Sequence, residues 1–157
     1  MYQQNQSIIY PLPTDALLLE REVVWRVKLP DDYKEFIKKE NGVIPSKRYF
    51  HFEHNEKVID RFLAILAISG EKTEEDYDIG VVSTQLEGRI VFDEDNVGMQ
   101  LIPIAALYGG DFLCLNYVED SENPNICIWY HEESYELEPA IEFLANNFTE
   151  FLAMLQD

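Results

Sequence analysis

Apolar side chains at helical spacing are clearest between residues 29 and 42, which read LPDDYKEFIKKENG. Phe36 and Ile37 lie three and four residues after Tyr33, so the three side chains share one face of a helix. Aspartates at the start and lysines near the end complement the helix dipole. Gly42 follows and accepts the left-handed backbone that commonly ends a helix. The segment is therefore predicted to be an amphipathic helix.

Helices are also predicted near both ends of the chain, at residues 14–27 and 139–157. Thr14 or Asp15 can cap the first of these, and Pro139 suits the start of the second. The apolar face of the first helix is predicted to consist of Leu18, Val23, Val24 and Val27. The apolar side of the second is predicted to consist of Ile141, Leu144, Phe148, Phe151, Leu152 and Leu155.

Alternation of apolar and polar residues predicts strands between the helices. Residues 111–118 and 125–132 alternate, and the turn-forming sequence EDSENP joins them, which predicts a hairpin. Residues 49–54 are predicted to form a short strand. Two segments leave the element type open: residues 58–69 fit a strand or a helix, and residues 79–98 fit two strands or a short helix and a strand.

The length of 157 residues fits a single domain, and no repeat or linker interrupts it. Residues 1–13 are polar and contain two prolines, which indicates an N-terminal arm ahead of a domain at 14–157. Paired strands between terminal helices indicate the α+β class. Neither a signal peptide nor an apolar run of about 20 residues is present, so the cytoplasm is the predicted location.

The charge is strongly acidic and unevenly distributed. The chain has 30 Asp and Glu against 12 Lys and Arg, a net charge of −18, and Arg89 is the last basic residue. Residues 90–157 contain 14 acidic residues and no Lys or Arg. This excess argues against binding nucleic acid or anionic membranes, both of which need cations. It suits a basic partner, although an acidic surface that maintains solubility remains the alternative.

The residues most often associated with chemistry do not form a recognisable site. Cys114 and Cys127 lack the close pairing of zinc ligands and are interpreted as packed thiols. Gly109 and Gly110 are followed by Asp111, where a phosphate-binding loop would need a lysine. They predict a tight turn with positive φ, in which Asp111 hydrogen-bonds the backbone. No catalytic, cofactor or metal site is predicted.

In their order along the chain, these motifs resemble the SUKH superfamily. LPDDYKEFIKKENG is followed by LIPIAALYGGDFLCLNY, by NPNICIWYHE and by FLANNFTEFLAML. The resemblance extends from about Glu22 to Leu155, whereas the acidic loop at residues 71–78 has no counterpart. The positions that carry it are Leu29, Pro30, Tyr33, Phe36, Asn41, Gly42, Gly109, Gly110, Asp111, Trp129, Phe148 and Phe151.

The superfamily includes fungal cell-wall regulators of the Smi/Knr type and bacterial immunity proteins against polymorphic toxins. The resemblance implies a bent antiparallel sheet with flanking helices, no cofactor and no catalysis. It implies a non-enzymatic immunity protein that binds a cognate, basic protein toxin; nucleases with basic substrate grooves are among such toxins. The alternatives are a regulatory scaffold or small-ligand-binding module in cell-envelope control and, less favoured, an enzyme.

The predicted contact surface for a basic toxin consists of acidic residues in three loops, with Tyr77 as an aromatic anchor. The acidic members are Glu74, Glu75, Asp76, Asp78, Asp93, Glu94, Asp95, Glu119, Asp120 and Glu122. For each residue taken singly, the alternative is a solvated loop carboxylate. Attraction between this surface and a basic partner predicts faster association at low salt.

Overall fold

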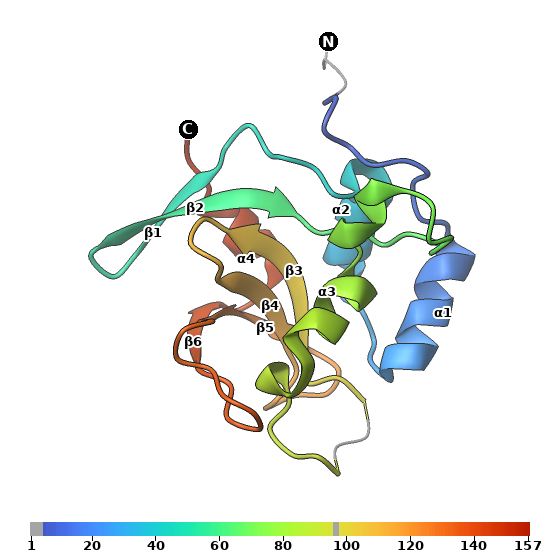
Figure 1. Ribbon diagram of the computed structural model, residues 1–157. Coiled ribbons are helices and arrows are strands. Elements are labelled where there is room, and N and C mark those ends of the chain that lie inside the picture. Colours follow the sequence, from blue (N-terminus) through green and yellow to red (C-terminus); the bar gives the residue numbers. More distant parts are fainter. Residues whose placement is uncertain (1–4, 96–97) are drawn as a thin grey trace.

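A computed structural model of the protein describes residues 5–95 and 98–157 (Figure 1). The described α-helices are α1 (Asp15–Trp25), α2 (Asp31–Glu40), α3 (Ile79–Leu86) and α4 (Phe148–Ala153), and the 3-10 helices are η1 (Thr73–Tyr77) and η2 (Glu87–Ile90). The strands are β1 (Tyr49–Phe52), β2 (Asn55–Phe62), β3 (Leu101–Leu107), β4 (Phe112–Asn116), β5 (Asn125–Trp129) and β6 (Ile141–Ala145). The predicted α+β class and single domain are confirmed.

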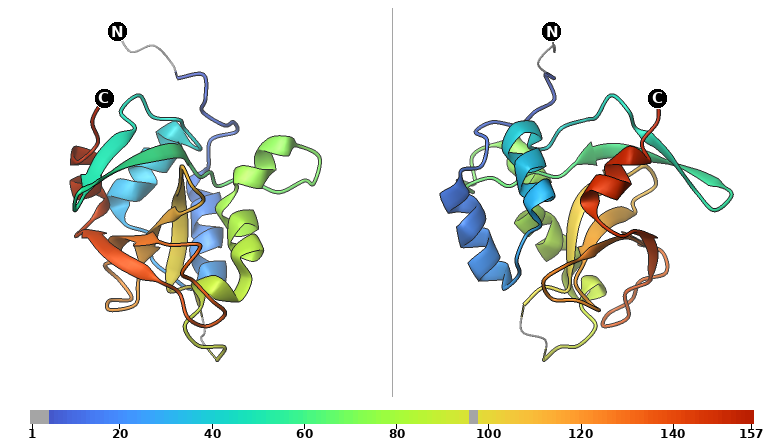
Figure 2. Two further views of the ribbon diagram at one scale, coloured as in Figure 1. Left: turned by 60° about the vertical axis from the view of Figure 1, so that its left-hand side comes forward. Right: turned by 180° about the vertical axis from the view of Figure 1, so that it is seen from behind.

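The strands form one antiparallel sheet in chain order, from β1 to β6. The pairing register shifts within β2–β3, β3–β4 and β5–β6, and shifts of this kind bend strands. Strands β3, β4 and β5 are almost entirely buried, so both of their faces are covered. Helix α3 lies in front of the sheet in Figure 1 and α4 behind it, and the reversed view of Figure 2 exchanges them. The β1–β2 hairpin projects beyond the body.

Helix α1 begins as predicted, but part of its predicted apolar face is wrong. The Thr14 side chain caps it by accepting a hydrogen bond from the Leu17 amide. Leu18 is buried as predicted, whereas Val23 and Val24 are 69% and 65% exposed. The reason is that Trp25, seven residues after Leu18 and therefore on the same face, takes the inner position.

Helix α2 agrees with the prediction, and Pro30 lies at its N-cap. Tyr33 and Ile37 are buried, and Phe36 is partly buried. Gly42 has φ +69°, and a Cβ atom there would lie 2.6 Å from Ile9. Both the backbone conformation and the space therefore require glycine at this position.

The predicted arm of residues 1–13 is described from residue 5 onward, and that part is held against the body. Ile9 is buried, and its amide donates to the Asn41 carbonyl at 2.8 Å. The Asn41 side chain is also buried; its amide nitrogen donates to the Ile9 carbonyl at 3.1 Å. Arg61 donates to the Ser7 carbonyl at 3.0 Å.

The predicted helix at 139–157 is wrong in its first half. Residues 141–145 form β6, which pairs with β5, and only residues 148–153 form a helix, α4. Asn147 caps α4 by accepting a hydrogen bond from the Glu150 amide. Pairing with β5 satisfies the backbone of β6 in an extended conformation, so a tertiary contact overrides the helical spacing.

The two segments of uncertain type are now assigned. Residues 58–69 contain the end of β2 and then an extended stretch, in which Leu63 donates to the Ile104 carbonyl. Residues 79–98 contain the predicted short helix, α3, whereas their described part forms no strand. The predicted hairpin is confirmed as β4–β5, with Cys114 opposite Cys127.

Two buried tyrosines differ in whether their hydroxyl is satisfied, which allows a paired test. The Tyr33 hydroxyl has no hydrogen-bond partner among the described residues, whereas the Tyr117 hydroxyl donates to the Lys28 carbonyl at 2.7 Å. We expect Tyr33→Phe to leave the free energy of unfolding unchanged or raised, because no hydrogen bond is lost. Tyr117→Phe is expected to lower it by about 1–2 kcal/mol. Urea unfolding measures both, and equal losses would contradict the difference.

Candidate functional site

The acidic residues of the predicted contact surface fall into two groups. Residues 74–78 lie in the upper half of the molecule, whereas residues 93–95 and 119–122 lie in the lower half, and all views in Figures 1 and 2 agree. Helix α3 and η2 run between the two groups. The structure therefore divides the predicted set between two places.

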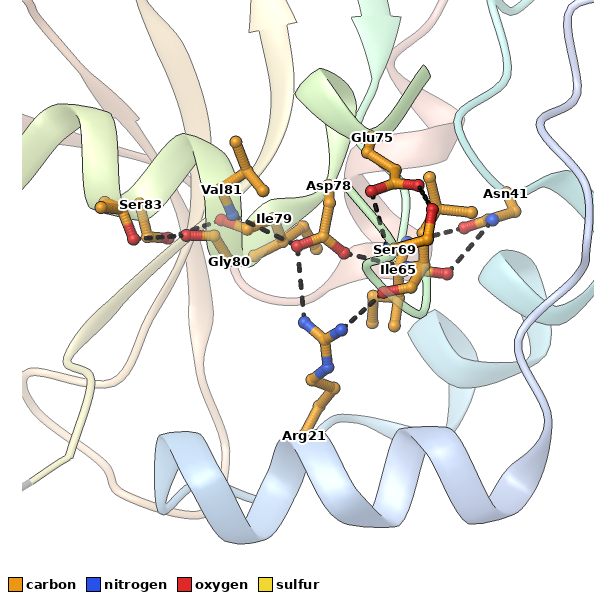
Figure 3. A network of polar contacts seen from close by, with 12 residues as sticks. Arg21, Asn41, Ile65, Ser69, Glu75, Asp78, Ile79, Gly80, Val81 and Ser83 are labelled. Atoms are coloured by element: carbon orange, nitrogen blue, oxygen red, sulfur yellow. Dashed lines mark hydrogen bonds and ion pairs between the residues drawn. The ribbon is translucent and has the colours of Figure 1, made fainter. Parts of the chain in front are cut away.

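Asp78, in the upper group, points into the protein (Figure 3). Its side chain is 1% exposed and accepts hydrogen bonds from the amides of Leu66 at 2.9 Å and Val81 at 3.2 Å. The second of these bonds caps α3. Arg21 of α1 lies 3.4 Å from the same carboxylate and also donates to the Leu66 carbonyl. This carboxylate joins α1 to α3 and is not available at the surface.

Glu75 has a similar internal role (Figure 3). It is 6% exposed and accepts from the Ser69 hydroxyl at 2.7 Å, the Ser69 amide at 2.9 Å and the Gly70 amide at 2.8 Å. Hydrogen bonds from the Ser69 hydroxyl and then from the Gly70 amide hold the pKa of Glu75 below its usual value. Glu74 and Asp76, by contrast, are exposed. Half of the acidic residues in the upper group are therefore structural.

Tyr77 also lies in the upper half and stacks within its own chain. The Arg61 guanidinium is 4.2 Å from the centre of its ring, and the side chain is 38% exposed. Together with residues 6–10, Tyr77 and Arg61 line a surface depression. The predicted aromatic anchor is thus separated from the acidic residues of the lower half.

In the lower half, all six predicted acidic residues are exposed: Asp93, Glu94, Asp95, Glu119, Asp120 and Glu122. Two of the aspartates organise their own turns. Asp93 accepts from the Asp95 amide at 3.0 Å, and Asp120 accepts from the amides of Glu122 and Asn123 at 2.9 and 3.1 Å. These amide hydrogen bonds lower the pKa of Asp120. The Asp120 carboxylate therefore keeps its charge to a lower pH than an ordinary aspartate.

A further acidic loop was missed by the sequence analysis. The connection between β5 and β6 exposes Glu132, Glu133, Glu136 and Glu138. It packs against η2, because the Leu137 amide donates to the Gly88 carbonyl at 2.9 Å and Arg89 donates to the Ser134 carbonyl at 3.1 Å. The acidic run HEESYELE, residues 131–138, could have indicated this loop, but the sequence analysis assigned residues 131 and 132 to a strand. We refer to the exposed carboxylates of 93–95, 119–122 and 132–138 as the acidic end.

Among the described residues, no arginine forms an ion pair with a carboxylate of the acidic end, although Arg89 lies against the 132–138 connection. Four of the five arginines in the chain donate to backbone carbonyls: Arg21 to Leu66, Arg48 to Ile59 and Asp60, Arg61 to Ser7 and Gly42, and Arg89 to His131 and Ser134. They therefore fasten loops and strand ends to one another. No sequence pattern distinguished these arginines from solvated ones.

The glycine turn and Asp111 were predicted partly correctly. Gly109 and Gly110 have φ of +101° and +99°, as expected for the tight turn. Asp111, however, accepts from the amide of His131, in the connection that follows β5, and not from a backbone group in its own turn. The same carboxylate oxygen lies 2.9 Å from His131 Nδ1, and the ring covers Gly110, where a Cβ atom would be 3.1 Å away.

This Asp–His pair lines a small surface depression with Gly109, Tyr130 and Glu133. The other ring nitrogen is 3.9 Å from Glu132, so the described neighbours that pair with the ring are carboxylates. A nucleophilic mechanism needs a hydroxyl or thiol beside the imidazole. No hydroxyl or thiol among the described residues hydrogen-bonds this ring, and the Asp111–His131 pair is best explained as a link between two turns.

The cysteines are buried, as predicted for packed thiols, and burial raises the pKa of Cys114. In the described ranges, no group of three His, Cys, Asp or Glu residues is placed to hold a metal ion.

A polar depression of about 340 Å³ lies where α2 and α4 begin, lined in part by Lys28, Asn123 and Asn147. Within the same ranges, no helix is long and apolar enough to span a bilayer.

Comparison with known proteins gives two matches. A family model described as "SMI1-KNR4 cell-wall" (SUKH_6) matches residues 16–152. The SPbeta prophage-derived uncharacterized protein YokK of Bacillus subtilis (strain 168) is 30% identical over 156 residues, which cover 94% of this chain and 78% of that protein. No solved structure gives a significant match.

Proposed function

This chain belongs to the SUKH (SMI1-KNR4) family, and from that we propose that it is a non-enzymatic immunity protein that binds and neutralises a cognate, basic protein toxin. Family membership supports a binding role with a protein partner. The prophage origin of the similar Bacillus subtilis protein agrees with a role in competition between genetic elements, although that protein's name states no activity.

One observation carries the choice of surface. The acidic end brings exposed carboxylates from three connections into the lower half of the molecule (Figures 1 and 2). Arg21, Arg48 and Arg61 bind backbone carbonyls outside it, and Arg89 lies against the 132–138 connection. Residues 90–157 provide no Lys or Arg to offset this charge. A surface of one sign attracts a partner of the other sign over a distance set by the Debye length.

The proposed mechanism is occlusion. The acidic end would approach the basic surface of the toxin, for a nuclease its substrate groove, and cover it. Charge attraction mainly raises the association rate, while contacts at the centre of the interface set the dissociation rate. Glu75 and Asp78 are excluded from this surface because their carboxylates are bound internally. No step of this mechanism needs a cofactor.

The proposal is tested by capturing the partner. The tagged full chain is incubated with extract of the native cell, and bound proteins are identified by mass spectrometry. We expect a basic partner encoded by a neighbouring gene, toxic when expressed alone and harmless when this chain is co-expressed. Failure to recover such a partner, together with no rescue from the neighbouring gene's product, would refute the immunity role.

The contribution of the acidic end is tested by association kinetics with the captured partner. The variant Asp93→Asn/Glu94→Gln/Asp95→Asn is expected to associate at least about tenfold more slowly at low salt, with a smaller difference at physiological salt. The control Glu74→Gln/Asp76→Asn removes two exposed charges from the upper half. It is expected to have a smaller effect. A rate that does not depend on salt would mean that the acidity serves solubility alone.

A regulatory or small-ligand role in cell-envelope control is the second candidate. The cell-wall description of the family and the polar depression beside Lys28 favour it. It predicts a captured partner that is not toxic and a neighbouring gene that can be expressed alone without harm. The capture experiment therefore separates the two roles.

A further inference from the structure

The two edges of the sheet differ in what covers them. At the β1 edge, the Tyr49 amide donates to the Gln156 carbonyl at 3.1 Å and the Gln156 amide donates to the Tyr49 carbonyl at 2.7 Å, so the C-terminal segment covers that edge at Tyr49. Strand β6 forms the opposite edge, at the lower end of the sheet in Figure 1. Over the part of the chain that the structure describes, no further strand pairs with β6. Such an open edge is a template for another extended chain.

The backbone groups that face this open edge belong to Ile141 and Phe143. The Tyr130 amide donates to the Ala140 carbonyl at 3.0 Å, which directs Ala140 toward β5. Neighbouring residues of an antiparallel strand point their amides and carbonyls alternately to one side and the other. Glu142 therefore also faces β5, whereas the amides and carbonyls of Ile141 and Phe143 face outward. The register shift of the β5–β6 pairing falls beyond Phe143, so the alternation is regular up to that residue.

The side chains along this edge offer two kinds of contact. Ile141 is partly buried and Phe143 is 54% exposed, and they lie on the same face because they are two residues apart in a strand. Glu142 projects from the other face and is exposed. An added antiparallel strand would therefore place every second residue beside the apolar pair and the residues between them on the side of the carboxylate.

The charged side chains exposed on β6 and on the connection before it are all acidic: Glu132, Glu133, Glu136, Glu138 and Glu142. Two cations approach this region. The Lys57 ammonium lies 5.5 Å from the centre of the Tyr130 ring, and Arg89 donates to the Ser134 carbonyl. Neither cation forms an ion pair with any of the five carboxylates in the described ranges. The charge beside the edge therefore favours a basic occupant.

We propose that β6 is the docking edge for an extended segment of the basic partner, which adds to the sheet as an antiparallel strand. The outward groups of Ile141 and Phe143 supply the backbone hydrogen bonds, and apolar residues of the segment pack beside their side chains. The basic residues between them lie on the side of Glu142. The partner's basic character rests on the proposed function; the docking edge adds that the partner supplies a strand of alternating apolar and basic residues.

Amide exchange in the isotope-labelled full chain, followed by NMR, tests this pairing. The probe is an eight-residue peptide of alternating valine and lysine, capped at both ends. At saturation it is expected to slow exchange of the Ile141 and Phe143 amides by at least about tenfold. The Glu142 amide faces β5 and is expected to change less. Exchange that is slowed only elsewhere, or not at all, would overturn the proposal.

Two methylated forms of the peptide separate backbone pairing from charge attraction. Methylation of the valine amides removes the donors to the Ile141 and Phe143 carbonyls and is expected to weaken binding by at least about tenfold. Methylation of the lysine amides leaves those donors in place at the same charge, so the affinity should be retained. Equal affinities of the two forms would show that charge alone holds the peptide, and a reversed order would exclude the antiparallel arrangement; either result overturns the proposal.

Variants of the chain locate the site. Phe143→Lys places a positive charge at the open edge and is expected to weaken peptide binding by at least about tenfold. Val24→Lys makes the same change in charge at a residue of α1 that is 65% exposed, and should leave binding nearly unchanged. Thermal unfolding confirms that both variants are folded. Equal affinity of Phe143→Lys and the unaltered chain would contradict the docking edge.

Two further outcomes separate this inference from its alternatives. Slower exchange of the Ile141 and Phe143 amides at rising protein concentration, without peptide, would assign the edge to a second copy and overturn the proposed occupant. Because the probe is synthetic, the peptide result does not depend on whether the capture experiment recovers a toxin. Failure of the docking edge and failure of the immunity role are therefore distinguishable.

Discussion

Replacing Phe151 by alanine is expected to lower the free energy of unfolding by about 3–5 kcal/mol, the usual cost of truncating a buried phenylalanine. The Phe151 side chain is fully buried, and its ring centre is 5.6 Å from that of Phe50 in β1. It also lies 6.4 Å from the ring of Phe148. The residue thus joins α4 to the hairpin that projects from the body, and its removal leaves a cavity between two distant segments.

Urea or thermal unfolding measures this loss, and Phe143→Ala is the matched control. Phe143 lies in the same C-terminal segment but is 54% exposed, so its truncation should change stability by no more than about 0.5 kcal/mol. Phe36→Ala is expected to fall between the two, since Phe36 is only partly buried although it contacts Phe62 and Phe148. A loss below about 1 kcal/mol for Phe151→Ala would show that α4 does not pack as described.

Replacing Asp78 by alanine is expected to cost about 3–5 kcal/mol, because it leaves a partly buried guanidinium without its partner. Arg21 would lose its ion pair, and the amides of Leu66 and Val81 would lose their acceptor. The loss therefore has two sources, an unpaired charge and two unsatisfied donors, and both act where α1 meets α3 (Figure 3).

Two variants separate these sources from a general effect of lost acidity. Asp76→Ala removes an exposed carboxylate two residues away and should change stability by no more than about 0.5 kcal/mol. Asp78→Asn keeps one acceptor oxygen but removes the charge, so its loss should be smaller than that of Asp78→Ala. Equal stability of Asp78→Ala and Asp76→Ala in urea unfolding would contradict the internal role of Asp78.

The features predicted correctly are those whose causes are local. Helix α2 was predicted from the spacing of Tyr33 and Ile37, and the positive φ of Gly42 from its lack of a side chain. The β4–β5 hairpin was predicted from alternation on either side of a short turn. In each case the residues that determine the conformation lie within a few positions of one another.

The errors arise where distant residues compete for the same backbone or the same buried position. Residues 141–145 have helical spacing, but the open edge of β5 holds them as a strand. Val23 and Val24 are as apolar as Leu18, but Trp25 occupies the inner face of α1. The conformation and burial of such residues depend on which other segment packs against them, and a short stretch of sequence does not contain this information.

The candidate site shows the same division. From the sequence alone it was determined that the second half of the chain is acidic, that it contains no Lys or Arg, and that its motifs resemble the SUKH superfamily. Only the tertiary structure decided which carboxylates can meet a partner. Glu75 and Asp78 are chemically equivalent to Glu74 and Asp76, yet the amides of Leu66, Ser69 and Gly70 bind the former pair and leave the latter exposed. Burial and hydrogen bonding depend on the chain that folds around a carboxylate, whereas charge depends only on its residue type.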